Sequence, residues 1–336
     1  MMDTPADVID HSVLYMRIIF AGMPASMLYN FGSAVLRAVG DTQRPLYFLM
    51  TAGIINVLLN LFFVIVLHMG VAGVALATIL SQTVSAVLVL VCLMRCEGAY
   101  RLDVKRLKIY GPKLRDMARI GIPAGIQSSM FSISNVLIQS TVNSFGSVAM
   151  AGSTAAGNIE GFLFTTLDAF TQGCQSFVGQ NYGAKKLDRV RKIVWMCVVL
   201  CTAIGAVLGV TAYLCGKSLL GIYSSDPEVI AYGMQRMAIN SALYFTFAPM
   251  NIFSGAMRGL GNSLLPMADS ILGTCVLRVA WVYTVFALFP SWQMLFISYP
   301  ASWALTGLLA GISYVFVKKK AVERLEQYRP RPQEAE

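Results

Sequence analysis

The chain has 336 residues, of which 56% are hydrophobic and only 13% are charged, with a formal net charge of +9. This composition is far more apolar than that of a soluble globular domain and excludes that class. Apolar stretches of about 20 residues or more recur along the whole chain, which predicts an all-α polytopic membrane protein.

The first part of the chain predicts a three-helix unit over residues 1–98, with helices at 12–36, 45–68 and 71–94. Residues 99–119 are the longest polar stretch and carry many basic side chains. They predict a cytoplasmic linker between two lobes, in the form of a short helix on the membrane surface. Residues 1–98 would then be a partial N-terminal lobe.

The rest of the chain predicts a complete six-helix lobe over residues 120–317. Its helices are expected at 120–145, 148–178, 193–216, 230–256, 265–289 and 292–317. Gly, Pro and short charged loops separate these stretches, as they do at helix ends. The tail, residues 318–336, is charged and predicts a cytoplasmic helix end that gives way to disorder.

Residues 8–45 and 229–266 repeat each other at an offset of 221 residues. Each copy ends an apolar helix with Arg-x-x-Gly-[Asp/Asn]-[Thr/Ser]-x-x-Pro. The motif residues, expected in cytoplasmic loops, are Arg37, Gly40, Asp41 and Pro45 in the first copy and Arg258, Gly261, Asn262 and Pro266 in the second. An intramembrane duplication of this kind is how many transporters build two facing bundles. The same arithmetic predicts about 108 further residues, enough for three helices, ahead of Met1 in the native protein.

The positive charge is concentrated in alternate loops, which the positive-inside rule assigns to the cytoplasm. The basic clusters lie at 37–44, 95–119, 185–192, Arg258 and 318–331, and the opposite loops are nearly bare. This places the C-terminus inside the cell. The basic balance therefore indicates topology and contact with a lipid bilayer, and not nucleic-acid binding.

Two predicted helices carry polar side chains at helical spacing, along one face each. The face in 120–145 includes Ser132, Asn135 and Gln139, and the face in 148–178 includes Thr154, Asn158, Thr165, Asp168 and Gln172. Polar side chains facing lipid are costly, so both faces must meet protein or water. One interpretation is hydrogen bonding between helices. Two long polar faces on successive helices favour a second interpretation, in which both faces line a hydrated substrate cavity.

Two acids, Glu160 and Asp168, lie within one predicted membrane helix. Ionising a carboxyl there costs several kcal/mol unless it is paired or wet, which makes each a candidate for coupling to a cation. Glu160 is the preferred candidate because it lies further from the basic cytoplasmic loop. The alternatives are a structural ion pair of Glu160 with Arg236 or Arg278, and a water-exposed Asp168.

The sequence contains no catalytic or nucleotide-binding motif, so no enzymatic activity is predicted. The seven cysteines are scattered through apolar segments, and the chain has two histidines, so no metal site is predicted either. We expect no cofactor, and we expect H⁺ or Na⁺ as the coupling ion.

Three segments, at residues 29–45, 70–82 and 177–184, resemble the multidrug and toxic-compound extrusion (MATE) family of bacteria, with 158–162 and 257–263 adding to the match. The resemblance implies a two-lobe antiporter of twelve helices that expels amphipathic cations against a H⁺ or Na⁺ gradient. The match begins at the family's fourth helix. The family's coupling acids have no counterpart here, because the equivalent helices either lie outside this sequence or contain no acid.

Three functional hypotheses follow. The leading one is a secondary-active antiporter of the bacterial inner membrane that exports drugs or organic cations by alternating access. A second is a flippase for a lipid-linked precursor, for which only Arg17, Arg236 and Arg278 could supply a cationic cavity. A third, of a different class, is a fragment that does not transport, or a membrane subunit that depends on a partner. Substrate identity, coupling ion and oligomeric state stay open.

Overall fold

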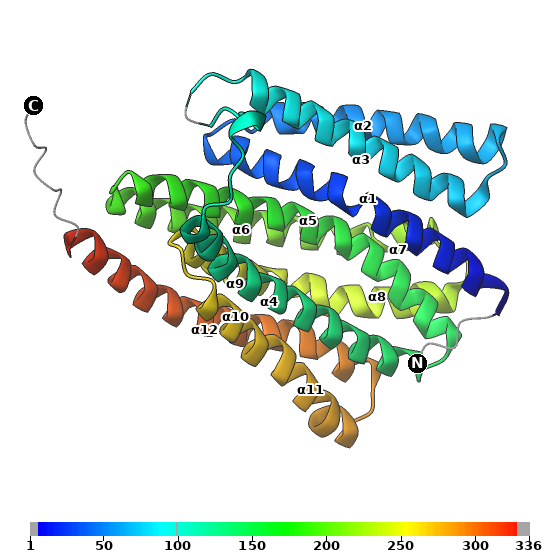
Figure 1. The fold of residues 1–336 in the computed structure, drawn as a ribbon. Coiled ribbons are helices and arrows are strands. Elements are labelled where there is room, and N and C mark those ends of the chain that lie inside the picture. The colour runs from blue at the N-terminus through cyan, green and yellow to red at the C-terminus, as the bar shows by residue number, and fades with distance from the viewer. Residues whose placement is uncertain (1–5, 99, 328–336) are drawn as a thin grey trace, which may run out of the picture. The chain divides into compact units, whose positions relative to one another are not determined.

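The computed structural model describes residues 6–98 and 100–327, which are almost entirely helical and contain no strand (Figure 1). The chain divides into two compact units, unit 1 (Met1–Ile109) and unit 2 (Tyr110–Glu336). The division falls within the stretch 99–119 that the sequence marks as a linker. The prediction of an all-α polytopic bundle is confirmed.

Unit 1 is a three-helix layer in which α3 packs against both α1 and α2. Its elements are α1 (Ala6–Ala38), α2 (Gln43–Leu61), a π-helical end η1 (Phe62–Val66), α3 (Gly70–Arg95) and a 3₁₀ turn η2 (Val104–Arg106). Gly22 and Gly32 let α1 approach closely, because a Cβ at either position would lie within 3.0 Å of Ile79 or Val89 side-chain atoms.

Unit 2 contains the remaining helices of the described chain. Its elements are α4 (Gly111–Asn143), α5 (Ser147–Gly183), α6 (Leu187–Leu214), α7 (Gly216–Gly221), α8 (Pro227–Ala242), η3 (Tyr244–Thr246), α9 (Phe247–Gly259), α10 (Leu264–Ser270), η4 (Ile271–Val276), α11 (Leu277–Trp281), η5 (Val282–Phe286) and α12 (Trp292–Gln327). The π-helical turn η4 joins α10 to α11, and η5 continues the same span to Phe286.

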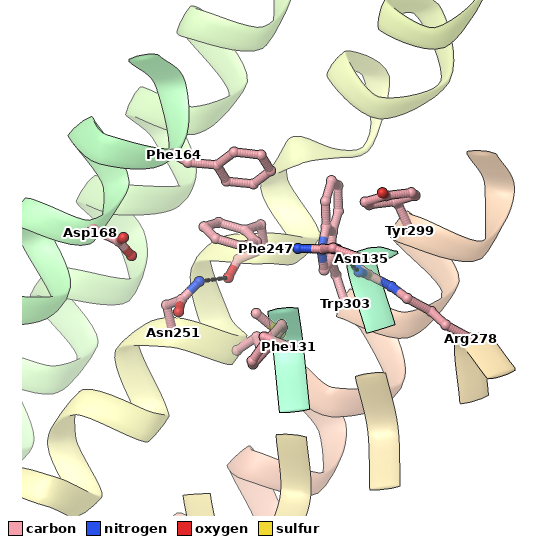
Figure 2. A pocket seen from close by; sticks show the side chains of 10 residues that line it. Phe131, Asn135, Phe164, Asp168, Phe247, Asn251, Arg278, Tyr299 and Trp303 are labelled. Atoms are coloured by element: carbon pink, nitrogen blue, oxygen red, sulfur yellow. Dashed lines mark hydrogen bonds between the residues drawn. The ribbon is translucent and has the colours of Figure 1, made fainter. Parts of the chain in front are cut away.

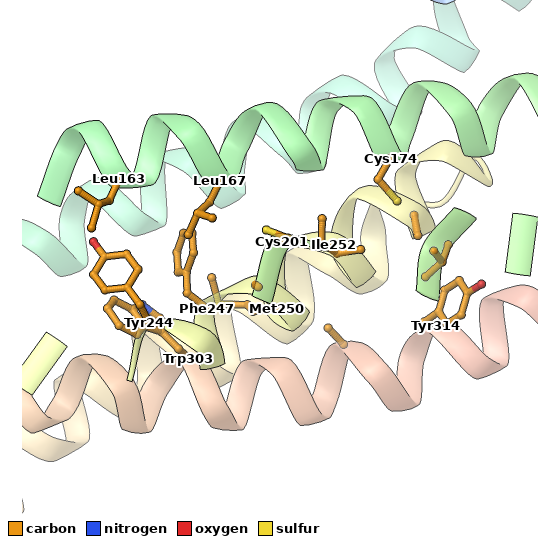
Figure 3. Close-up of a cluster of buried hydrophobic side chains, with 14 of the residues drawn as sticks. Leu163, Leu167, Cys174, Cys201, Tyr244, Phe247, Met250, Ile252, Trp303 and Tyr314 are labelled. Carbon is orange, nitrogen blue, oxygen red and sulfur yellow. The ribbon is translucent and has the colours of Figure 1, made fainter. Parts of the chain in front are cut away.

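Helix α5 is central to the core of unit 2, since it packs against α6, α8 and α9. A Cβ on Gly152 would lie 2.5 Å from the Val229 carbonyl oxygen, and one on Gly259 would lie 2.8 Å from that of Gln175. These glycines therefore bring the backbones together. Large buried side chains, among them Leu167, fill the space between α5, α9 and α12 (Figure 3).

The predicted helix 230–256 is broken into α8 and α9 by the 3₁₀ turn η3. Pro249 lies in the first turn of α9, where its missing N–H needs no partner within the helix. The break places Tyr244 in the core, fully buried, and starts α9 with Phe247 facing inward. It therefore positions aromatic side chains midway along the span.

Six helical segments in the described part of the chain have the length and apolar composition to cross a membrane. They are Ile9–Ala38, Gln43–Val66, Gly70–Arg95, Leu187–Leu214, Leu264–Phe286 and Trp292–Leu325. Three of the nine predicted spans, those at α4, α5 and α8–α9, are absent from this set although they are helical. Their polar side chains lower the hydropathy of α4 and α5, and the break divides α8 from α9.

The predicted start of the first helix of unit 2 is wrong. Helix α4 begins at Gly111 and not near residue 120, because Pro112 suits the first turn of a helix. The surface helix expected within 99–119 is therefore only the 3₁₀ turn η2. Helix α12 continues past residue 317 to Gln327, as the helix end predicted from Lys318 onward requires. Residue 99 and the end of the predicted tail, 328–336, lie outside the described residues.

The two copies of the sequence repeat share their local structure. Helix α1 spans Ala6–Ala38 and the α8–α9 segment spans Pro227–Gly259, which are the same positions after the shift of 221. Each copy ends in a Schellman turn, with a glycine at positive φ (Gly40, 93°; Gly261, 81°). In each, a backbone N–H donates five residues back, from Asp41 to Leu36 and from Asn262 to Met257, both at 2.9 Å.

The acidic or amide position of the motif caps the next helix in both copies. Asp41 Oδ1 accepts from the N–H of Arg44 at 3.1 Å, and Asn262 Oδ1 accepts from the N–H of Leu265 at 3.2 Å. The repeated sequence motif thus specifies the same helix–turn–helix connection in both copies.

Candidate functional site

A cavity of about 350 Å³ lies in unit 2 among α4, α5, α9, α11 and α12 (Figure 2). Five aromatic rings and one methionine make up most of its wall, and four polar side chains reach it. The lining residues are Phe131, Asn135, Phe164, Asp168, Phe247, Met250, Asn251, Arg278, Tyr299 and Trp303. A concave, mostly apolar site with a few converging polar groups is the usual form of a small-molecule pocket.

The aromatic wall is held rigid by contacts among its own rings. Phe164 meets Phe247 at 4.9 Å and Trp303 at 6.0 Å between ring centroids, both edge to face. Trp303 in turn meets Tyr299 at 6.0 Å, one helical turn away on α12. Edge-to-face packing of this kind is favourable, and these rings line the cavity. The wall can therefore hold a flat apolar or cationic group.

Asp168 reaches the pocket from α5, on the polar stripe that the sequence identified. Its side chain is exposed and forms none of the ion pairs found among residues 6–98 and 100–327. The guanidinium of Arg258 is near enough to act on it electrostatically. Asp168 thus offers a carboxylate that a cation can reach.

Arg278 enters the same pocket from α11 and is 2% exposed. Its Nε donates to Ser302 Oγ at 3.0 Å and its Nη1 to Asn135 Oδ1 at 3.2 Å. The guanidinium also lies 4.1 Å from the centroid of the Tyr299 ring. All of these partners are neutral.

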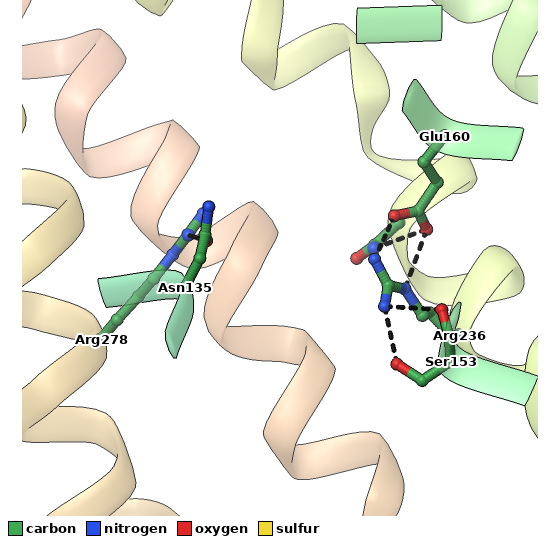
Figure 4. Close-up of polar contacts among 6 residues, drawn as sticks. Asn135, Ser153, Glu160, Arg236 and Arg278 are labelled. Atoms are coloured by element: carbon green, nitrogen blue, oxygen red, sulfur yellow. Dashed lines mark hydrogen bonds and ion pairs between the residues drawn. The ribbon is translucent and has the colours of Figure 1, made fainter. Parts of the chain in front are cut away.

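Glu160 lies away from this pocket, in a buried ion pair with Arg236 of α8 (Figure 4). Arg236 Nη2 donates to Oε2 at 2.6 Å and its Nε to Oε1 at 3.3 Å, while Asn240 Nδ2 donates to Oε1 at 2.8 Å. Arg236 Nη1 also donates to Ser153 Oγ at 2.7 Å. Of the two interpretations weighed for Glu160, the pair with Arg236 is the arrangement present.

The other predicted cavity residues are not gathered in the pocket. Of the seven, only Asn135 lines it. Gln139 donates to Asn143 on its own helix at 3.1 Å, and the hydroxyls of Thr154, Thr165 and Ser132 bond to backbone carbonyls one turn back. The remaining side chains, Asn158 and Gln172, are exposed on α5. These six therefore form polar faces of α4 and α5 outside the pocket.

The motif arginine of the second copy connects α9 to α4. Arg258 Nη2 donates to Gln127 Oε1, and Gln127 Nε2 donates to Ser270 Oγ at 2.6 Å. Pro266 is buried in the first turn of α10. In unit 1, the Pro45 carbonyl accepts from the Tyr29 hydroxyl at 3.0 Å. The motif residues are thus placed to fix helix connections.

Sequence reasoning missed most of the pocket wall. Phe, Tyr and Trp at helical spacing look the same whether they fill a core or line a cavity, so Phe164, Phe247 and Trp303 gave no signal of their own. Arg278 did give a signal, because an arginine within an apolar span is unusual, and the sequence marked it as a candidate cavity residue or partner of Glu160.

The fold and the pocket together define a multi-pass helical membrane protein of the transporter type. A family model described as MatE matches residues 1–62 and 123–284. The chain belongs to this family, as the motif resemblance indicated.

Two relatives and one solved structure illustrate the likeness. The probable multidrug resistance protein YoeA of Bacillus subtilis is 30% identical over 97% of this chain and 73% of its own length. YpnP of the same organism, also a probable multidrug resistance protein, is 31% identical over 87% of this chain and 64% of its own length. The fold is similar to a crystal structure of MATE in the straight conformation, with a TM-score of 0.86 at 18% identity, covering 96% of this chain and 72% of that one.

Proposed function

We propose that the protein exports amphipathic organic cations in exchange for H⁺ or Na⁺. The observation that carries this proposal is the pocket of unit 2, which aromatic rings and the unpaired carboxylate of Asp168 line together. Ring faces and a carboxylate are the two groups that attract a flat organic cation. The names of the relatives, probable multidrug resistance proteins, support the same substrate class.

Asp168, and not Glu160, is the proposed coupling residue. A coupling group must be loaded and released in turn, which requires access from the cavity. Glu160 is 2% exposed and its charge is compensated by Arg236, so releasing it would leave a buried arginine unpaired. Asp168 has no such partner and lines the pocket. A returning H⁺ or Na⁺ on Asp168 would displace the substrate cation.

The proposed cycle is alternating access by rocking of two lobes in the bacterial inner membrane, with the C-terminus in the cytoplasm. The repeated helix–turn–helix connection supports this, since duplicated units are typical of carriers that work by rocking. The basic residues of the alternate loops support the orientation.

The flippase alternative is weakened by the pairing of Arg236. A site for a lipid-linked pyrophosphate needs several cationic side chains without a counter-charge, and the charge of Arg236 is already neutralised by Glu160. The third hypothesis, a chain that does not transport, is decided by experiment.

The test is ethidium export from a bacterium that lacks its own dye-efflux pumps. Cells that express the chain should lose ethidium faster than cells with an empty vector, and the Asp168→Asn variant should abolish the difference. Asp188→Asn, which removes an exposed carboxyl from the first turn of α6, is the matched control and should export normally. Export no faster than the empty vector would favour a non-transporting chain.

A further inference from the structure

Two arginines of unit 2, the buried Arg278 and the partly buried Arg236, lie near the same ring, and only one of them has a counter-charge. Arg236 lies 6.0 Å and Arg278 4.1 Å from the centroid of Tyr299. Arg236 is neutralised by Glu160. Arg278 has no carboxylate partner among the residues that the structure describes. The pocket therefore contains one guanidinium, that of Arg278, which no carboxylate contacts, and the carboxylate of Asp168 lines the same pocket without touching it.

Burying a charge without a partner is costly in any protein interior and more so within a membrane. Hydrogen bonds to Ser302 and Asn135 and the Tyr299 ring lower this cost but leave the net charge in place. Those bonds use Nε and one N–H of Nη1. A guanidinium has five N–H donors, so three are not used by these two bonds, and Arg278 is one of the residues that line the cavity.

We propose that Arg278 is an anion subsite within the substrate pocket, which binds a carboxylate, sulfonate or phosphate group of the transported molecule. The proposal rests on the proposed function of this pocket as the substrate site. The planar guanidinium matches such groups in shape and charge, and the bonds to Ser302 and Asn135 fix its orientation in advance.

Asp168 and Arg278 lie on opposite sides of the aromatic rings in Figure 2. A molecule that satisfies both must carry a cationic and an anionic group separated by a flat apolar body. Among the aromatic cations that this pocket can bind, the geometry therefore favours those that also carry an anionic group.

A pair of dyes with one shared body tests this on the purified protein. A cationic xanthene dye with a free carboxylate is a zwitterion, and its methyl ester keeps the cation but lacks the anion. The unmodified protein should bind the free acid about ten-fold more tightly than the ester, as expected for a charge-assisted hydrogen bond. Benzoate should compete with the acid more strongly than benzamide does.

Substitution assigns the preference to the residue. Arg278→Gln should weaken binding of the acid about ten-fold and leave binding of the ester unchanged. The affinity of Arg278→Lys for the acid should lie between that of the unmodified protein and that of Arg278→Gln. Arg191→Gln removes an exposed positive charge from α6 and should alter neither dye. If Arg278→Gln fails to fold, Arg278→Lys and the benzoate competition still decide.

The outcomes separate this proposal from the one on which it rests. Equal affinity for acid and ester in the unmodified protein, or an acid preference that survives Arg278→Gln, would overturn the anion subsite and leave the cation pocket intact. Failure to bind either dye would overturn the pocket as the substrate site.

Discussion

Glu160 and Asp168 lie two turns apart on α5 and have different surroundings. Ile159 and Leu163, near Glu160, are buried in the core of unit 2, and Arg236 and Asn240 face the carboxylate across the α5–α8 contact. Asp168 lies about 80° further round the helix, on an exposed face with other polar side chains of α5. Position within the helix therefore decides which acid is structural and which one a cation can reach.

Removing one partner of the buried pair should destabilise unit 2. In Glu160→Gln the Arg236 charge stays buried without a counter-charge, which costs about 3–5 kcal/mol. We expect a lower midpoint of thermal unfolding for the purified protein in detergent. The double variant Glu160→Gln, Arg236→Gln should recover part of the loss. A midpoint unchanged in the single variant would show that the pair contributes nothing.

The sequence revealed the candidates at this site but not their partners. Asn135 and Asp168 were visible because polar residues at a spacing of three and four mark one helix face. Arg236 was visible as a basic residue within an apolar span. That Arg236 meets Glu160 while Arg278 meets Tyr299 depends on how α8, α11 and α12 pack, and spacing along the chain contains no information about that.

Helix α6 contains two glycines one turn apart, and the structure gives them different roles. A Cβ on Gly209 would lie 2.7 Å from the Ser241 carbonyl oxygen, whereas one on Gly205 would lie 3.6 Å from Leu167, an ordinary contact. Only Gly209 is therefore required for the approach of α6 to the end of α8.

This difference predicts that the same substitution, glycine to alanine, changes the stability of the protein differently at the two positions. Gly209→Ala should destabilise the protein by about 1–3 kcal/mol, because backbone must move. Gly205→Ala should be neutral or stabilising by up to about 1 kcal/mol, since alanine favours the helix. Thermal unfolding of both variants in one detergent is the measurement. Equal destabilisation by both would contradict the packing described here.

The repeated connection between helices depends on a left-handed residue. Gly261 has φ of 81° and nothing within 4 Å of a Cβ, so a side chain there would meet only backbone strain. Gly261→Ala should cost about 1–2 kcal/mol, and Gly261→Asn should cost less, because asparagine tolerates this conformation. Thermal unfolding of the two variants checks this prediction: the midpoint of Gly261→Asn should be higher than that of Gly261→Ala. The reverse order would argue against the Schellman turn.

Helix existence and the helix–turn–helix repeat were predictable, whereas several helix ends were not. Hydropathy located the apolar stretches, and Gly40 and Gly261 marked the turns. The start of α4 at Gly111 was missed because Lys113, Arg115 and Asp116 look like loop residues by composition. The break between α8 and α9 has only Pro249 as a local signal, and a proline in a membrane helix can equally produce a bend.

The molecule as a whole combines a three-helix unit with a larger unit that contains the pocket. The matching helix bounds and turns of residues 6–66 and 227–286 indicate that one ancestral segment was used twice. A pseudo-twofold axis between the copies stays a prediction, as does the cavity that the exposed polar face of α5 would line. Both belong to the proposed cycle of alternating access.

Gradient-driven dye uptake by liposomes containing the purified protein tests the central claim most directly. Vesicles loaded with acid or with Na⁺, and held at zero membrane potential, should accumulate external ethidium under one of the two gradients. Asp168→Asn vesicles should bind the dye on the aromatic walls but not accumulate it. Accumulation that needs neither gradient, or that is equal in Asp168→Asn vesicles, would contradict cation-coupled transport through this pocket.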